Sequence, residues 1–338
     1  MKAVQITETG APEVLKYVDL PTPKPGLGEV LVKAHAIGVC MPETLVRKGT
    51  YLWMPPLPAI PGIEMSGTIV EAGSSVSKLR VGQPVFVSAR EFKERGGCYA
   101  EYLAAPENTL YPLPEGIDLD QAAGLSNYQV AWHLLNSALK GFQYDSVLVF
   151  AAAGGVGTAL VQLAKAAGKH VIGVVSSDTR AAFARAQGAD DVIDRKHGNI
   201  VDQVKQLTNR RGVDLVLDIA GGAAMTALFD CLGRFGMLLL YGRLDGPPTG
   251  NIAAAAEKAP WRSLAYRYFT MHTLDDWPEL RASATHDLIR MLRDGTIKVP
   301  IYERIPLAEA ARAHQVFESG QVMGKLIMKP SVMVRVAI

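Results

Sequence analysis

Residues 151–157 read AAAGGVG and connect a short apolar run to an alanine-rich amphipathic one. The first run, SVLVF at 146–150, has the composition of a buried strand, and the second, TALVQLAKAAG at 158–168, has the periodicity of a helix. A strand, a turn of very small residues and a helix in this order predict the first crossover of a doubly wound sheet. In such a turn the backbone, not the side chains, meets whatever lies at the edge of the sheet.

The small residues of this turn indicate an anion site. Unpaired N–H groups and the helix dipole attract negative charge, and the lack of side chains lets a pyrophosphate approach the backbone. The pattern is close to G-x-G-x-x-G, with an alanine in place of the first glycine. The alternative is a turn that only permits close helix packing. We predict a dinucleotide site with phosphate contacts from Ala152, Gly154, Gly155, Val156 and Gly157.

Strand-like and helix-like segments continue to alternate after this turn. The alternation predicts right-handed βαβ crossovers and a parallel sheet, and so an α/β fold with a Rossmann domain over 121–270. Residues 1–120 are rich in proline and glycine around short β-branched runs, which predicts a mainly β unit. The strand-like runs of the central part are HVIGVV (170–175), DVID (191–194), VDLVLDI (213–219) and GMLLLYG (236–242).

The residues after the second strand bear on the choice of dinucleotide. An acidic residue there would bind the ribose 2′-OH of NAD, but the strand ends in Ser176 and Ser177. Asp178 comes one position later, where we expect it to cap the next helix. Arg180 and Arg195 are placed to converge on a 2′-phosphate through charge-assisted hydrogen bonds. We therefore predict NADP rather than NAD.

Composition excludes several classes of partner. The formal net charge is +2 and no long run of Lys or Arg occurs, so neither nucleic acid nor an anionic membrane surface is an expected partner. The longest apolar run, 147–161, contains three glycines and is too short to span a bilayer. The three cysteines, Cys40, Cys98 and Cys231, are scattered. This pattern predicts free thiols in a reducing cytoplasm.

Several longer segments resemble the medium-chain dehydrogenase/reductases, and among them the zinc-independent quinone oxidoreductases related to zeta-crystallin. The resemblance rests on GAPEVLKYVDLPTPKPGLGEVLVKAHAIGV, PGIEMSGTIVEAGSSVSKLRVGQPV, the AAAGGVGTALVQLAKAAG segment and the terminal GKLIMKP. It implies a mainly β, GroES-like catalytic domain built from both chain ends, 1–120 and 271–338, around the Rossmann domain. The last residues, SVMVRVAI, extend beyond the usual end of the family.

The resemblance also bears on metal. Zinc-dependent relatives place a cysteine at Cys40, a histidine at Ile63 and a third ligand near Leu125 or Ser126. Only Cys40 remains, and one thiolate does not hold a catalytic zinc that needs three protein ligands. We predict no metal, Cys40 as a small wall residue of the substrate pocket, and a hydrogen-bonding role for Glu64.

Without zinc no Lewis acid polarises a carbonyl, so the acceptor must already be electrophilic. The resemblance and this argument together predict NADPH-dependent hydride transfer to a small quinone or α,β-unsaturated carbonyl. Tyr51 is the candidate proton donor, since similar enoyl reductases place a tyrosine in this loop, and an aromatic pocket lining is its alternative role. Two other functions stay open: an enoyl thioester reductase, and a protein that binds NADPH without turnover.

The remaining predicted cofactor contacts are His133, Tyr241, Gly242, and Lys325 as a cation near the phosphates. The strand RFGMLLLYGRL at 234–244 is apolar at both parities, which predicts burial on both faces. In the resembled family the corresponding sheet edge pairs with its two-fold mate. We therefore expect a homodimer with one continuous sheet across both cofactor domains.

Overall fold

The computed structural model describes residues 1–330, so the SVMVRVAI extension lies outside the described residues. The chain forms two compact units. The split unit comprises Met1–Ser126 and the chain from Thr285, and the central unit comprises Asn127–Ala284. The domain limits expected from sequence, 120 and 270, fall earlier in the chain than these divisions, and each division lies within a helix. These helices are α3 (Leu125–Leu135) and α8 (Pro278–Arg293).

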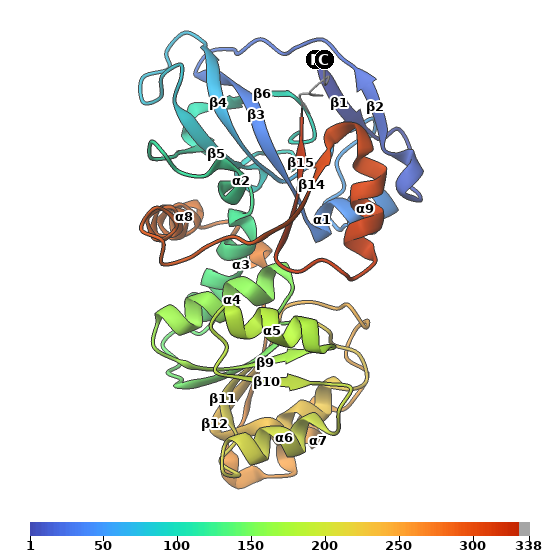
Figure 1. Ribbon diagram of the computed structural model, residues 1–338, viewed down its shortest axis with the longest axis vertical. Coiled ribbons are helices and arrows are strands. Elements are labelled where there is room, and N and C mark those ends of the chain that lie inside the picture. The colour runs from blue at the N-terminus through green and yellow to red at the C-terminus, as the bar shows by residue number, and fades with distance from the viewer. Residues whose placement is uncertain (331–338) are drawn as a thin grey trace, which may run out of the picture. The chain divides into compact units, whose positions relative to one another are not determined.

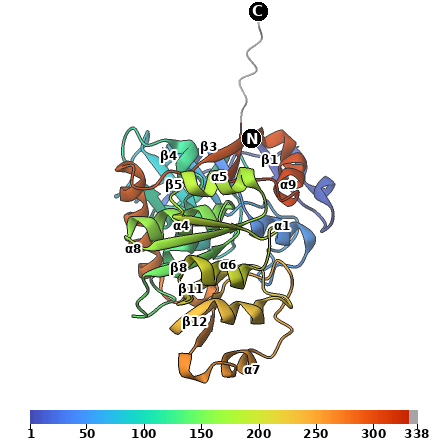
Figure 2. The same ribbon diagram turned by 60° about the horizontal axis from the view of Figure 1, so that its bottom comes forward.

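The central unit is built on a parallel sheet with the strand order β10-β9-β8-β11-β12-β13. All of its ladders are parallel, as the alternating sequence predicted. Figure 2 shows β8, β11 and β12 side by side in this unit. The strands are β8 (Ser146–Phe150), β9 (His170–Val175), β10 (Asp191–Asp194), β11 (Val213–Asp218), β12 (Leu232–Leu240) and β13 (Ala265–Tyr268).

Helices cover both faces of this sheet, which makes the fold doubly wound. On one face, a Cβ at Gly173 of β9 would lie 2.9 Å from the Ala152 methyl group and 3.8 Å from that of Ala184 in α5. On the other face, Leu148 and Leu238 share an apolar cluster with α6, the 3₁₀ helix η4 and α7. The helices are α4 (Gly155–Ala166), α5 (Asp178–Ala186), α6 (Ile200–Leu207), α7 (Ile252–Glu257) and η4 (Met225–Cys231).

The strand β12 is not at the edge of the sheet. It pairs with β11 on one side and with β13 on the other. An inner strand of a sheet whose two faces are covered by helices is buried on both faces, which explains why residues 236–240 of β12 are apolar and buried at both parities. The expectation that this strand pairs with a second copy is therefore wrong. The edge strand on this side of the sheet is β13, and β10 is the edge strand on the other side.

The split unit joins both ends of the chain in one mixed sheet. Its long strand β3 (Glu29–Val39) pairs antiparallel with β4 (Glu64–Ala72), β6 (Tyr102–Pro106) and the last strand β15 (Lys325–Lys329). Figure 1 shows the red strand β15 beside the blue β3. Completing the unit are β5 (Pro84–Ser88), β7 (Leu110–Pro112), β14 (Ile301–Pro306) and a separate pair, β1 (Lys2–Gln5) and β2 (Lys16–Asp19).

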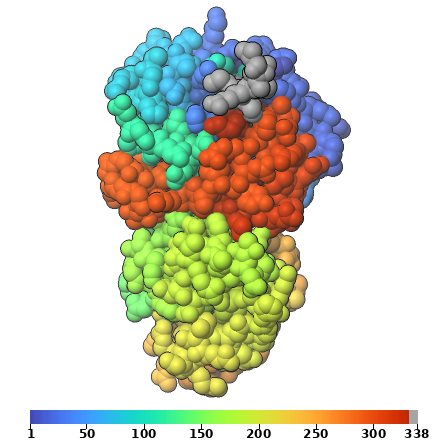
Figure 3. Space-filling view, viewed as in Figure 1, coloured from blue at the N-terminus to red at the C-terminus, as the bar shows by residue number. Residues whose placement is uncertain are grey.

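Helices of both chain ends pack against this sheet. Arg47 of α1 is 1 % exposed and donates to both carboxylate oxygens of Glu318 in α9, at 2.8 and 2.7 Å. Figure 3 shows the C-terminal residues, in orange and red, next to N-terminal ones in blue on the surface of this unit. The helices are α1 (Met41–Lys48), α2 (Leu119–Ala122) and α9 (Ala310–Glu318), and the short 3₁₀ turns of the chain are η1 (Pro12–Val14), η2 (Ala89–Glu91), η3 (Glu107–Thr109), η5 (Pro260–Arg262), η6 (Met271–Leu274) and η7 (Leu307–Glu309).

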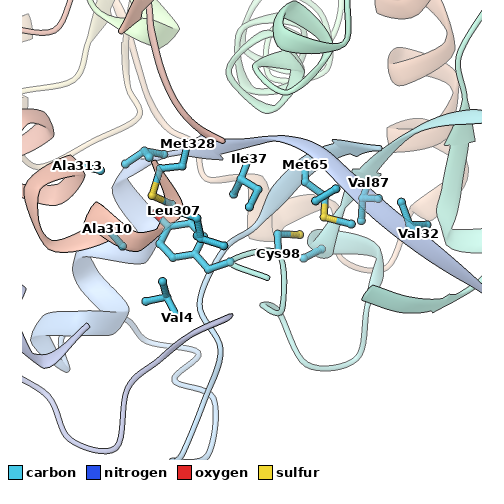
Figure 4. Close-up of a cluster of buried hydrophobic side chains, with 14 of the residues drawn as sticks. Val4, Val32, Ile37, Met65, Val87, Cys98, Leu307, Ala310, Ala313 and Met328 are labelled. Carbon is cyan, nitrogen blue, oxygen red and sulfur yellow. The ribbon is translucent and has the colours of Figure 1, made fainter. Parts of the chain in front are cut away.

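An apolar core holds the split unit together (Figure 4). Residues from the first 100 positions and from beyond 300 contribute to it, so neither chain end can form this core alone. Among residues 1–330, no helix is both long and apolar enough to cross a bilayer. The labelled core residues in Figure 4 are Val4, Val32, Ile37, Met65, Val87, Cys98, Leu307, Ala310, Ala313 and Met328.

Candidate functional site

The predicted phosphate loop connects β8 to α4. Gly154 is the N-cap of α4, and its N–H donates to the Ala151 carbonyl at 2.8 Å. The N–H groups of the first helical turn, beginning at Gly155, have no intrahelical acceptor and point out of the helix. A helix N-terminus of this kind is suited to bind a phosphate.

The glycines of this loop differ in what the fold requires of them. A Cβ at Gly157 would lie 2.0 Å from the Ala151 carbonyl oxygen, so the fold itself requires glycine there. A Cβ at Gly154 would lie 3.3 Å from the same oxygen, so a small side chain there needs a shift of only a few tenths of an ångström. Close packing thus accounts for Gly157, while Gly154 remains a predicted phosphate contact. Ala152 is fully buried, and its methyl group faces Gly173, so this side chain packs inside the unit.

The strand order gathers further predicted residues at the carboxyl edge of the sheet. The strands β8 and β11 are neighbours, and the helices that follow them lie on opposite faces of the sheet. Doubly wound sheets bind their ligands at such a switch point. Ser176 follows β9, Arg195 follows β10 and Tyr241 follows β12. Because the strands are parallel, these residues share one edge with the phosphate loop.

The two predicted arginines follow neighbouring strands. The N–H of Arg195 donates to the Val175 carbonyl at 2.9 Å, which brings the end of β10 to the end of β9. Arg180 lies in the first turn of α5, where its N–H contacts the Ser177 hydroxyl at 3.4 Å. Ser177 is therefore the N-cap, and the expectation that Asp178 caps this helix is wrong. Asp178 is the first helical residue, because the serine before it has the extended backbone of a cap.

A buried carboxylate that the sequence analysis missed shapes the loop after β11. Asp218 is 1 % exposed and accepts hydrogen bonds from the N–H groups of Ala220 (2.8 Å) and Gly221 (3.1 Å). Burial raises its pKa, and these two hydrogen bonds oppose the rise. The carbonyl of Asp218 also accepts from the Tyr241 N–H at 2.9 Å. The only sequence feature that indicates Asp218 is its position as an acidic residue at the end of an apolar strand.

Tyr241 and Gly242 lie next to this loop. The Tyr241 hydroxyl is buried and has no hydrogen-bond partner within residues 1–330, and burial raises its pKa. An unpartnered buried hydroxyl is costly unless a ligand or water satisfies it, which keeps Tyr241 a candidate contact. A Cβ at Gly242 would lie 2.6 Å from the backbone and side chain of Ile219. The close approach of the two loops therefore accounts for this glycine.

In the split unit, three side chains form a buried cluster. Lys325 is 1 % exposed, and its Nζ donates to Glu64 Oε1, to Cys40 Sγ at 2.9 Å and to the Val39 carbonyl at 3.1 Å. Glu64 Oε2 accepts from the Ser126 N–H at 2.8 Å. The role of Lys325 as a cation near the cofactor's phosphates stays a prediction, and these contacts favour a role inside the split unit instead. Its three donors are used inside the unit, where Glu64 needs a counter-charge.

The cluster defines the chemistry of its members. Burial disfavours the ammonium of Lys325, but the electrostatic attraction of Cys40 and Glu64, followed by its hydrogen bonds to them, outweighs burial and raises its pKa. Burial, together with the charge of Glu64, raises the pKa of Cys40 well above its usual value. Cys40 is thus a thiol and not a reactive thiolate. It is 5 % exposed and contacts charged groups, so an apolar pocket wall describes it incompletely.

A second buried carboxylate, Glu43, was also missed. Glu43 is 1 % exposed and accepts from the N–H groups of Cys40 at 3.1 Å and Ile63 at 2.9 Å. Burial raises its pKa to about 7, although the hydrogen bonds act in the opposite direction. Glu43 ties the N-terminus of α1 to the turn before β4. A glutamate three residues after the N-cap is part of a capping box, so this pattern could have identified Glu43 from the sequence.

Tyr51 and His133 have different surroundings. Tyr51 lies in the loop after α1, partly buried, with its ring 5.8 Å from that of Trp53. Neighbouring Leu52 is 86 % exposed. His133 of α3 is fully buried, and its Nδ1 lies 2.9 Å from the Ser137 hydroxyl. A buried ring with this local partner fits a packing role better than the predicted cofactor contact.

Two family models match the chain. The Alcohol dehydrogenase GroES-like domain matches residues 26–115, and the Zinc-binding dehydrogenase model matches 155–284. A quinone oxidoreductase of Pseudomonas aeruginosa is 34 % identical over 334 residues, which cover 97 % of this chain and 99 % of the relative. The chain belongs to the quinone oxidoreductase family of medium-chain dehydrogenase/reductases.

Solved structures of the family show the same fold. The quinone oxidoreductase of Escherichia coli complexed with NADPH is 29 % identical with a TM-score of 0.86, over 98 % of this chain and all (100 %) of that one. A mycobacterial protein complexed with NADPH is 33 % identical with a TM-score of 0.86, over the same shares of the two chains, 98 % and 100 %. The family membership confirms the GroES-like and Rossmann architecture predicted from the sequence.

One of the matching family models is named for zinc, and the residues here do not fit a zinc ion. Between Cys40 and Glu64, where a metal would have to bind, the ammonium of Lys325 contacts both side chains. No group of three or more His, Cys, Asp or Glu side chains in the described part of the chain is arranged to hold a metal. Catalytic zinc needs three protein ligands and an open position.

Proposed function

We propose that this protein is an NADPH-dependent reductase that transfers hydride to a quinone or to an α,β-unsaturated carbonyl without zinc. The observation that carries the proposal is the phosphate loop at the switch point of the central sheet, in a chain whose relatives are quinone oxidoreductases. Two of the similar solved structures are complexed with NADPH. When bound, NADPH supplies the hydride.

The residues of the central unit would hold the cofactor. The N–H groups after Gly154 bind the diphosphate, as the free donors of the first turn of α4 allow. Arg180 and Arg195, next to Ser176, bind the 2′-phosphate by charge-assisted hydrogen bonds. The Tyr241 hydroxyl supplies a further donor at the same edge of the sheet.

The residues of the split unit favour an acceptor that is already electrophilic. With Lys325 bonded to Cys40 and Glu64, the unit offers no metal to polarise an alcohol or a simple carbonyl. Reduction of a quinone or a conjugated alkene gives a delocalised anion that needs little acid catalysis. Tyr51 is the proposed proton donor, and the Trp53 ring beside it suits a planar apolar acceptor.

Two alternatives share the same cofactor site. An enoyl thioester reductase would use the same hydride with an acyl thioester as acceptor. A cofactor-binding protein would keep the phosphate loop but lack turnover. Binding of NADPH does not separate these functions, so turnover with defined acceptors must be measured.

The test follows the oxidation of NADPH by the purified protein with a panel of quinones, enones and enoyl thioesters. We expect turnover with quinones or enones and slower turnover with NADH. Oxidation by enoyl thioesters alone would support the first alternative. Tight NADPH binding without oxidation by any acceptor would contradict the proposed function and support the second.

We also propose a small-molecule substrate, a cytoplasmic location and a homodimer. The thiols of Cys40, Cys98 and Cys231 are free and buried, which suits a reducing compartment. The edge strand β13 has a partner on one side only in the ladder order of the central sheet. A second copy that pairs along this edge would satisfy its outward N–H and C=O groups.

A further inference from the structure

The surroundings of the Lys325 ammonium have the form of a cation site. Its Nζ has a sulfur, a carboxylate oxygen and a carbonyl oxygen as neighbours, from Cys40, Glu64 and Val39. None of these residues is more than 5 % exposed. Three electron-rich atoms, from two strands and a helix cap, therefore surround the Lys325 ammonium in the interior of the split unit.

The same three atoms are suitable ligands for a divalent ion. Zn²⁺ takes thiolate sulfur at about 2.3 Å and carboxylate oxygen at about 2.0 Å, which at a tetrahedral angle places the two ligands about 3.5 Å apart. Cys40 Sγ and Glu64 Oε1 are 3.0 Å apart, so a small movement would bring them to this spacing. With the Val39 carbonyl and one water, the site would reach four ligands. A mixed sulfur and oxygen set suits Zn²⁺ or Co²⁺ better than Mg²⁺.

We propose that Lys325 is a tethered cation that fills this site and keeps a divalent metal out of it. The ammonium and a metal ion cannot share the position, because they would need the same ligand atoms and would repel each other. Together with the lack of zinc-ligand side chains at Ile63 and at Leu125 or Ser126, this accounts for a chain that matches a zinc-binding dehydrogenase model and yet has no fitting metal site among its described residues. The inference rests on the split unit alone and does not depend on the cofactor or acceptor proposed above.

Two glycines show that the fold makes room for this arrangement. A Cβ at Gly38 would lie 2.4 Å from Glu64 Oε1 and 2.6 Å from the Ala123 carbonyl oxygen. A Cβ at Gly124 would lie 3.1 Å from Lys325 Cγ and 2.6 Å from Val299 Cγ1. A side chain at either glycine would therefore collide with Glu64 or crowd Lys325, so the backbone here is fitted to the two charged side chains.

The test removes the tethered cation and offers a metal in its place. Lys325→Ala is titrated with Co²⁺ without oxygen, and the thiolate-to-cobalt absorption in the near ultraviolet is recorded. We expect one Co²⁺ per chain, bound at least about a hundredfold more tightly than by the wild type. Lys325→Arg retains a cation and is the matched control without the band. Lys325→Ala combined with Cys40→Ser should also lack the band, because the thiolate is gone.

Two results would overturn the proposal. One is a folded Lys325→Ala protein that binds no Co²⁺, and the other is a wild type that shows the same band at the same affinity. If Lys325→Ala does not fold by itself, circular dichroism with and without one equivalent of Zn²⁺ decides. Recovery of structure with Zn²⁺ supports a metal site, and no recovery contradicts it. None of these measurements uses NADPH, so their failure leaves the proposed function unaffected.

Discussion

Glu64 and Lys325 lie 261 residues apart in the sequence and form an ion pair inside the split unit, where their side chains are 0 % and 2 % exposed. The pair connects the first residue of β4 with the first residue of β15. Through Ser126 and Cys40 it also reaches α3 and the N-cap of α1. A buried charge needs its partner, so this contact couples the two ends of the chain.

The first prediction concerns the stability that depends on this pair. Lys325→Met leaves Glu64 charged and unpaired, and should lower the free energy of unfolding by about 3 to 5 kcal/mol. The double change Lys325→Met with Glu64→Gln removes both charges and should recover a large part of the loss. Urea unfolding of the four proteins in the cycle measures this coupling. A double variant as unstable as the sum of its singles would show that the pair is not coupled.

The second prediction separates the two glycines of the phosphate loop. Gly157→Ala places a methyl group 2.0 Å from the Ala151 carbonyl and should destabilise the central unit by several kcal/mol, roughly as overpacking does. Gly154→Ala should fold normally, because its nearest contact is 3.3 Å, but should weaken NADPH binding. Thermal unfolding and cofactor titration check both variants. Unchanged NADPH affinity in Gly154→Ala would remove this residue from the binding site.

The third prediction concerns the choice between NADPH and NADH. Arg180→Ala and Arg195→Ala should each raise the Kd for NADPH at least about tenfold, given ~1.5 to 3 kcal/mol for a hydrogen bond to a charged group. The Kd for NADH should hardly change. Lys196→Ala is the matched control, because Lys196 is an exposed cation next to Arg195. Equal losses for both cofactors would mean that the arginines do not contact the 2′-phosphate.

The fourth prediction is a loss of stability in acid that arises from His314. This side chain is fully buried, its Nε2 lies 3.0 Å from the Tyr99 hydroxyl, and burial lowers its pKa from 6.5 to about 4. The unfolded chain therefore takes up the proton first as the pH falls. Stability from the neutral ring is complete above the unfolded pKa of 6.5 and falls by about 3 kcal/mol toward pH 4.

Glu43 acts in the opposite direction over an overlapping range, so the test must isolate His314. The raised pKa of Glu43, about 7, means that stability is complete below its unfolded pKa of 4.5 and is lost as the pH rises through 7. Wild type and His314→Leu share this contribution, and their difference cancels it. Urea unfolding at about pH 7 and about pH 4.5 should show a smaller acid loss in His314→Leu. Equal acid losses in both proteins would exclude His314 as the source.

Local sequence patterns and the family resemblance predicted much of the fold. Side-chain contacts between segments far apart in the sequence were not predicted, because no local pattern indicates them. The phosphate loop was found because strand, turn and helix follow one another within about two dozen residues. The ion pair of Lys325 was not predicted, because nothing near this lysine in the sequence indicates Glu64 as its partner. The segment GKLIMKP predicts a strand but not its neighbours in the sheet. The pairing of β15 with β3 follows only from the strand order.

The same limit explains the error about the sheet edge. The strand β12 is apolar at both parities, which shows burial on both faces but does not show which strands lie beside it. The short β13 is partly exposed and less apolar, so its sequence does not indicate a strand. The edge of a sheet is a property of strand order. The composition of a single strand therefore does not predict whether that strand lies at the edge.

The last prediction is therefore that the homodimer forms along β13. The Phe269 N–H donates to the Leu240 carbonyl at 3.0 Å, so by alternation the N–H of Tyr268 points away from β12. Tyr268→Pro removes this outward donor without removing a ladder bond to β12, and should shift the protein toward monomer. Leu239→Pro, inside the sheet, should instead unfold the central unit. Light scattering at micromolar concentration, with circular dichroism as the folding control, measures both. A wild-type mass equal to one chain, or a dimer unaffected by Tyr268→Pro, would contradict this arrangement.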